Sequence, residues 1–98
     1  MKTGIELIAE ERRQQIEQHG RTVKADVDFN TGEQLRKAAH RLIEVCPSEL
    51  NPPKGWDGNI WAKMCRKPYL ERMVIAGSLL AAEIDRVKYA KRYRSAKP

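Results

Sequence analysis

This sequence of 98 residues contains two cysteines and no long apolar run, and each scarcity excludes a class of protein. Cys46 and Cys65 stand 19 residues apart, with no second pair of ligands to complete a zinc site. No apolar run approaches the ~20 residues that cross a membrane, and no signal-peptide core follows Met1. These absences predict a cytoplasmic protein with reduced thiols and no membrane partner.

The chain also has few residues that can build a core. Val, Ile, Leu, Met, Phe and Trp number 25, and ten of the residues counted as hydrophobic are alanines. That composition suits one small domain and is too little for a deep, walled active-site cavity. No glycine-rich phosphate loop, nucleophile elbow or zinc signature is present.

Acidic residues are missing from the end of the chain. Residues 1–85 hold 13 basic and 13 acidic side chains, whereas residues 86–98 hold six basic ones and no acid. We therefore expect a helical domain at residues 1–87 and a basic tail at residues 88–98 that continues the last helix. Clustered cations attract polyanions, although a solubilising helix end is the alternative interpretation. The candidate polyanion-binding residues are Lys88, Lys91, Arg92 and Arg94.

The spacing of apolar residues predicts an all-α fold with three main helices. The first begins after a capping box formed by Thr3 and Glu6 and ends at Gly20. Residues 20–30 alternate apolar and polar side chains, which predicts an extended loop with a strand across a dimer interface as the alternative. A second capping box, from Thr31 to Gln34, opens a second helix that ends at Pro47.

A long connection, residues 47–68, joins the second helix to the third. It carries four of the five prolines and both tryptophans, and a short helical turn is expected at residues 58–65. The third and longest helix is predicted from Tyr69 to about Tyr93. Because this helix is apolar almost all round between residues 73 and 82, we expect a helical-bundle homodimer or larger assembly.

The two tryptophans of the connection lie among cations and form the best candidate contact surface. Aromatic faces beside cations stack bases and hold phosphates. The same side chains can instead anchor a protein interface or cover a small core, so these alternatives stay open. The candidate ligand-binding residues are Arg12, Trp56, Trp61, Lys67 and Arg72.

The carboxylates suggest an alternative, enzymatic hypothesis. Small all-helical nucleotide pyrophosphohydrolases of the MazG type bind Mg²⁺ through two acidic motifs, each with two carboxylates one helical turn apart. Glu83 and Asp85 are only two residues apart and point to different faces of a helix, so the second motif is missing. Under this alternative the metal ligands would be Glu10, Glu11, Glu83 and Asp85, with Arg12 on the phosphates.

Three stretches of the chain resemble a family of small proteins encoded by bacteriophages and prophages: GIELIAEERRQQIEQHG, TGEQLRKAA, and GWDGNIW with KPYLERMVIAGSLLAAEIDR. The family pattern is an ER-x-x-QI-E helix, a G-x-T-P-E-H-D-D loop, a G-E-L helix, a Trp-rich linker and a closing A-G-A-L-I-A-A-E-I-D-R helix. The resemblance covers residues 4–86. It departs in the loop, where Val23, Ala25 and Val27 replace the proline, the histidine and the second aspartate. The resemblance implies an accessory role in the cytoplasm of a bacterial host, such as counteracting or altering a host system.

The main hypothesis is therefore a non-enzymatic phage accessory protein that binds or blocks an anionic partner. That partner would be a nucleotide, a nucleic acid or an acidic host protein, and no metal or cofactor is expected. The alternative is a Mg²⁺-dependent nucleotide pyrophosphohydrolase resembling the MazG type.

Overall fold

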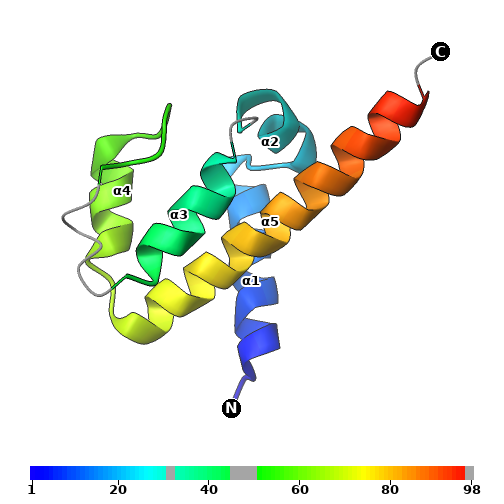
Figure 1. Cartoon of the computed structure of the whole chain (residues 1–98). Helices are drawn as coiled ribbons and strands as arrows, with labels where there is room; N and C mark the ends of the chain where they lie inside the picture. The colour runs from blue at the N-terminus through cyan, green and yellow to red at the C-terminus, as the bar shows by residue number, and fades with distance from the viewer. Residues whose placement is uncertain (31–32, 45–50, 97–98) are drawn as a thin grey trace.

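The computed structural model describes residues 1–30, 33–44 and 51–96, with side chains described as far as Ala90. Within these ranges the chain forms five helices and no strand, which confirms the all-α prediction (Figure 1). The helices are α1 (Gly4–His19), α2 (Val23–Phe29), α3 (Gln34–Leu42), α4 (Gly58–Cys65) and α5 (Tyr69–Ala96).

The long helix α5 is the central element of the fold. Helices α1, α2 and α3 each pack against it, while α4 contacts it less extensively. Figure 1 shows α1 crossing α5 and α3 running beside it, with the last turns of α5 projecting beyond the other helices. No helix in the described part of the chain is both long and apolar enough to cross a membrane.

Helix α1 begins and ends where the sequence predicts. The backbone N–H of Glu6 donates to the Thr3 hydroxyl, and the Glu6 carboxylate accepts from the Thr3 backbone N–H, each at 3.2 Å. At the other end Gly20 adopts φ 65, the left-handed conformation that glycine reaches without a steric cost.

Residues 23–29 form helix α2, so the predicted extended loop is wrong at this place. Thr22 caps the helix by accepting from the backbone N–H of Ala25 at 3.1 Å. The alternating pattern misled because the side chain that points inward is the charged Asp26, which is 1% exposed, while Val23 and Val27 are only half-buried. A helix also satisfies its own backbone, whereas the described chain offers no strand for an extended segment to pair with.

Helix α3 begins at Gln34 after Glu33, whose φ is 64 and whose side chain makes no capping hydrogen bond. The predicted cap Thr31 lies outside the described residues, and the predicted end at Pro47 is wrong, because the helix ends several residues earlier. The α3 helix ends at Leu42, and the Nη1 of Arg72 donates to the carbonyl of Leu42 at 2.8 Å and to that of Glu44 at 3.1 Å. Arg72 thus holds the end of α3 against the start of α5.

The short helix expected at residues 58–65 is confirmed as α4. The Asp57 carboxylate caps it by accepting from the backbone N–H groups of Asn59 and Ile60 at 2.7 and 3.0 Å. Trp61 is 3% exposed, and with Met64 and Cys65 it carries the buried face of α4 into the core. The rest of the core comes from α3 and α5: Leu35, Ala38, Ala39, Leu42, Ile75, Ala76, Leu79 and Ala82.

Helix α1 crosses α5 at Gly77, and this contact supports a first prediction. A Cβ at Gly77 would lie 2.6 Å from Cδ1 and 2.9 Å from Cγ1 of Ile8. Gly77→Ala gains about 1 kcal/mol of helix propensity but overpacks the crossing at a cost of about 1–3 kcal/mol. We expect a net loss of about 1 kcal/mol in the free energy of unfolding, measured by urea denaturation. In an Ile8→Ala background the same substitution should instead stabilise the protein, and equal effects in both backgrounds would contradict the crossing.

Candidate functional site

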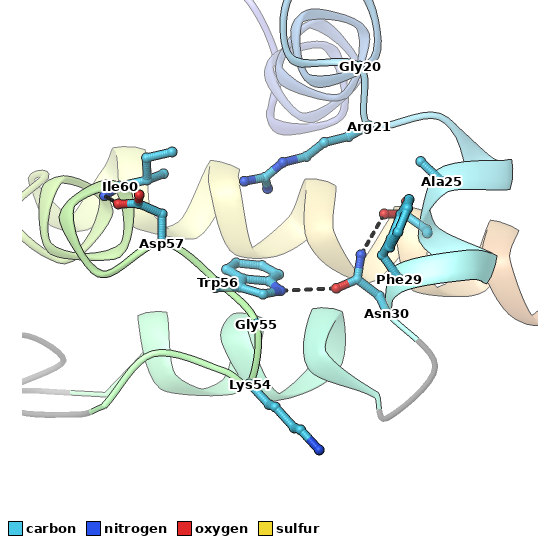
Figure 2. Close-up of a pocket in the computed structure, with 11 residues that line it drawn as sticks. Gly20, Arg21, Ala25, Phe29, Asn30, Lys54, Gly55, Trp56, Asp57 and Ile60 are labelled. Atoms are coloured by element: carbon cyan, nitrogen blue, oxygen red, sulfur yellow. Dashed lines mark hydrogen bonds between the residues drawn. The ribbon is translucent and has the colours of Figure 1, made fainter.

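A pocket of about 240 Å³ opens between α2, the turn at Gly20 and Arg21, and the segment that leads into α4 (Figure 2). Its lining comes from residues 20–30 and 54–60, two segments that α3 separates in the sequence. Its lining includes one cation over one indole ring, an exposed phenylalanine and the polar end of α2.

Trp56 forms one wall of this pocket and is held on two sides. Its ring meets that of Trp61 edge to face, with centroids 6.2 Å apart and an interplanar angle of 77°. Its Nε1 donates to Oδ1 of Asn30 at 3.0 Å, and Nδ2 of Asn30 donates to Oδ1 of Asp26 at 2.9 Å (Figure 2). The indole is therefore fixed by the core behind it and by α2 beside it.

The turn before Trp56 explains how this residue reaches the pocket. The backbone N–H of Trp56 donates to the carbonyl of Pro53 at 3.1 Å, and Gly55 between them has φ 84. A turn with that φ favours glycine. Trp56 is consequently presented beside α2, while Trp61, five residues later, lies in the core.

Arg21 supplies the cation of the pocket. Its guanidinium carbon lies 5.1 Å from the centroid of the Trp56 ring, and Figure 2 shows the side chain reaching over the indole. Within the described residues this guanidinium has no hydrogen bond and no ion pair. Burial lowers the pKa of Arg21, and the nearby carboxylates of Asp26 and Glu11 oppose that effect. A partly desolvated guanidinium with unused donors is suited to a phosphate or carboxylate.

The remaining walls are aromatic and polar. The Phe29 side chain is 77% exposed at the end of α2 and stands at the edge of the pocket. The Asp57 carboxylate lines the opposite side and is engaged in capping α4. Lys54 is exposed, and Figure 2 shows its side chain directed away from the Trp56 ring.

Behind the pocket, Arg12 and Asp26 form a buried charge pair. Nη2 of Arg12 lies 3.8 Å from Oδ2 of Asp26 and 3.9 Å from Oδ2 of Asp85, and its Nη1 donates to the carbonyl of Arg21 at 3.0 Å. Burial raises the pKa of Asp26, while Arg12 and the hydrogen bond from Asn30 act in the opposite direction. Arg12 thus supports the turn that carries Arg21 and neutralises the carboxylate to which Asn30 is bonded.

The structure does not bring the predicted ligand-binding residues together on one surface. Trp56 lines the pocket, Arg12 lies behind it, and Trp61 belongs to the core. Lys67 lies 3.6 Å from the carboxylate of Glu71, and Arg72 is engaged with backbone carbonyls at the end of α3.

The four carboxylates of the enzymatic alternative do not form a metal-binding group among the described residues. In the described ranges no three His, Cys, Asp or Glu side chains are grouped so that they could hold a metal ion. Each carboxylate has a neighbour of its own: Lys2 for Glu10, Gln15 for Glu11, Arg86 for Glu83 and Arg12 for Asp85.

Helix α5 extends through the basic tail as far as Ala96. Lys88 is exposed. The side chains of Lys91, Arg92 and Arg94 lie outside the described part of the structure.

Sequence reasoning missed Arg21, Phe29 and Asn30. Arg21 follows the glycine that ends α1, and Phe29 is the single phenylalanine of the chain, so both were visible as unusual residues. What joins them to Trp56 is a contact across more than 25 positions, which no local pattern contains.

No protein-family model, no curated protein and no solved structure matches this chain. The function is therefore inferred from the geometry of the site.

Proposed function

We propose that this chain is a non-enzymatic module that binds an anionic partner, and that the partner is a nucleotide held in the pocket between α2 and Trp56. The observation that carries the proposal is the guanidinium of Arg21, which lies over the Trp56 ring at 5.1 Å and has no anionic hydrogen-bond partner among the described residues. A bound phosphate would supply that partner.

The size and lining of the pocket favour a nucleotide over a protein segment. About 240 Å³ is just below the range of about 300–1,000 Å³ that small-ligand sites typically span, so the occupant has to be small. The exposed ring of Phe29 and the edge of Trp56 offer apolar contact for a flat base. The pocket thus offers one cation, one or two aromatic surfaces and the amide-bearing end of α2. These features match the parts of a nucleoside monophosphate.

The biological setting that we propose is a phage or prophage accessory protein in the cytoplasm of a bacterial host, acting as a homodimer or larger assembly. The support for the setting is the resemblance of residues 4–86 to the family pattern described above. A small module of this kind would sequester a nucleotide or block the host system that uses it.

The proposal predicts that nucleoside monophosphates bind and that Arg21 dominates their affinity. We expect isothermal titration calorimetry to detect AMP, CMP, GMP or UMP, with adenosine and inorganic phosphate each binding more weakly than AMP. Arg21→Gln should weaken the affinity at least tenfold, because it removes the cation and retains most of the side-chain volume. The matched control is Lys24→Gln, which removes an exposed cation from α2 that does not line the pocket.

Two results would contradict the proposal. One is an unchanged affinity in Arg21→Gln when circular dichroism shows the variant to be folded, and the other is an absence of heat with all four nucleotides. Pyrophosphate release from a nucleoside triphosphate in the presence of Mg²⁺ would instead overturn the non-enzymatic assignment and favour the pyrophosphohydrolase alternative.

A further inference from the structure

A second surface, distinct from the nucleotide pocket, lies where α1 crosses α5. A groove of about 510 Å³ runs between the two helices and is lined by the apolar side chains of Ile5, Ile8, Ala9, Ile16 and Ala81. We call this surface the α1–α5 groove. Ile5 is exposed at one end of it, and Ile8 and Ile16 are half-buried along it.

Helix α5 carries an exposed apolar ridge of its own. Leu80, Ile84 and Val87 are spaced i, i+4 and i+7, and each remains exposed. This spacing is typical of a helix that packs against another helix. Ala81 of the groove directly follows Leu80 of the ridge, so groove and ridge share the same helix.

The charges around the groove are of both signs. Arg13 and Glu17 stand one turn apart on α1 and both line the groove. In the described part of the chain neither side chain has a hydrogen bond or an ion pair. Arg12 also lines the groove, but it is buried and paired with Asp26 and Asp85, so the exposed charges of the rim are Arg13 and Glu17. One exposed cation and one exposed anion do not select a strongly acidic or strongly basic partner, whereas they are complementary to their own copy turned by a two-fold axis.

We propose that the α1–α5 groove and the adjoining ridge form the interface of a homodimer, in which Arg13 of each copy faces Glu17 of the other. A two-fold interface places the same patch of both copies in contact, so one molecule supplies both the apolar groove and the apolar helix that covers it. The interface removes from water the apolar side chains that the single chain leaves exposed. Its rim pairs Arg13 with Glu17, which make no hydrogen bond or ion pair among the described residues.

The first test compares two exposed isoleucines. Ile84 on the ridge is 60% exposed and Ile43 at the end of α3 is 51% exposed, so neither is required by the core. In sedimentation velocity and light scattering, the wild-type chain should have twice the 11.3 kDa mass of the monomer. Ile84→Glu should weaken dimerisation at least tenfold, and Ile43→Glu should leave it unchanged.

The second test uses charge reversal across the two copies. Arg13→Glu alone places two acids opposite each other, and Glu17→Lys alone places two bases opposite each other, so each variant should be largely monomeric. A mixture of the two variants restores opposite charges at both contacts and should form the heterodimer. This rescue distinguishes a contact between copies from an ion pair within α1, which mixing cannot restore.

A wild-type chain that stays at 11.3 kDa at all concentrations would overturn the proposal, as would an Ile84→Glu variant that dimerises as tightly as the wild type. A mixture that remains monomeric would overturn the pairing of Arg13 with Glu17. None of these substitutions lies in the nucleotide pocket, so the calorimetric test of that pocket is independent of them.

Discussion

Trp61→Ala is expected to lower the free energy of unfolding by about 3–5 kcal/mol, the range for removing a buried tryptophan. Trp61 is 3% exposed and packs with Met64 and Cys65 from its own helix and with the apolar faces of α3 and α5. A small domain has only about 5–15 kcal/mol of stability in total. The variant should therefore lose much of its helical circular dichroism near physiological temperature and shift its urea midpoint strongly downward.

The neighbouring Ile60 provides the matched control for this prediction. It lies on the same short helix and is half-exposed, so Ile60→Ala should change the free energy of unfolding by less than about 1 kcal/mol. Similar losses of unfolding free energy in the two variants would contradict the packing of α4 against the core through Trp61. The two tryptophans should also differ from each other. Trp56 is only partly buried, so its replacement should lower ligand affinity more than it lowers the free energy of unfolding.

The elements that local sequence specifies were predictable. Thr3, Glu6 and Gly20 define the ends of α1 through hydrogen bonds to their own backbone neighbours, and Asp57 begins α4 in the same way. These signals act over three or four residues and do not depend on the rest of the chain. The apolar spacing of α5 is equally local, which is why its start at Tyr69 was predicted correctly.

Helix α2 was missed because its stabilisation is tertiary. Its inward residue is Asp26, and a carboxylate is buried only when a distant cation compensates for its lost hydration. That cation is Arg12, fourteen positions earlier and on another helix. The sequence-based prediction followed the alternating apolar residues and therefore gave an extended loop, because nothing near Asp26 in the sequence shows that its side chain is buried.

The candidate site was predictable only in part for the same reason. Trp56 was identified by its type and its cationic surroundings, but Arg21, which lies over its ring, comes 35 positions earlier in the chain, before α3. Trp61 was grouped with Trp56 because the two are five residues apart. The tight turn at Gly55 and the start of α4 between them direct one indole to the pocket and the other to the core.

A continuous polar path links the core of the fold to the pocket. It runs from Arg12 to Asp26, from Asp26 to Asn30, and from Asn30 to the indole of Trp56. Arg12 also holds the backbone carbonyl of Arg21. A change at Arg12 therefore reaches both the stability of α2 and the geometry of the site.

Arg12→Met is accordingly expected to destabilise the protein by about 3 kcal/mol at neutral pH, near the lower end of the cost of leaving one charge of a buried pair without its partner. The variant keeps much of the apolar length of the side chain and removes its charge. Arg66→Met is the matched control, because Arg66 is exposed and its side chain has no hydrogen bond or ion pair among the described residues. That control should lie within about 0.5 kcal/mol of the wild type.

The pH dependence of this loss identifies its cause. Burial raises the pKa of Asp26 in the folded protein above its value in the unfolded chain. This pKa difference contributes to the free energy of unfolding. The contribution is fully present below the pKa of the unfolded chain, where Asp26 is neutral in both states, and it is lost as the pH rises through the pKa of the folded protein. Removing Arg12 takes away the largest influence that lowers the pKa of Asp26, so the folded pKa rises further in the variant.

The difference in unfolding free energy between the wild type and Arg12→Met should therefore be greatest at neutral pH. It should shrink as the pH falls through the raised pKa of Asp26, because a protonated carboxyl group no longer requires a buried cation. Urea denaturation at a series of pH values measures this difference directly. A loss that is the same at acidic and neutral pH would show that Arg12 stabilises the fold through packing and its hydrogen bond to Arg21. The same comparison can be made with Asp26→Leu present in both proteins. The loss caused by Arg12→Met should then no longer follow the titration of Asp26, since no buried carboxylate remains at this position.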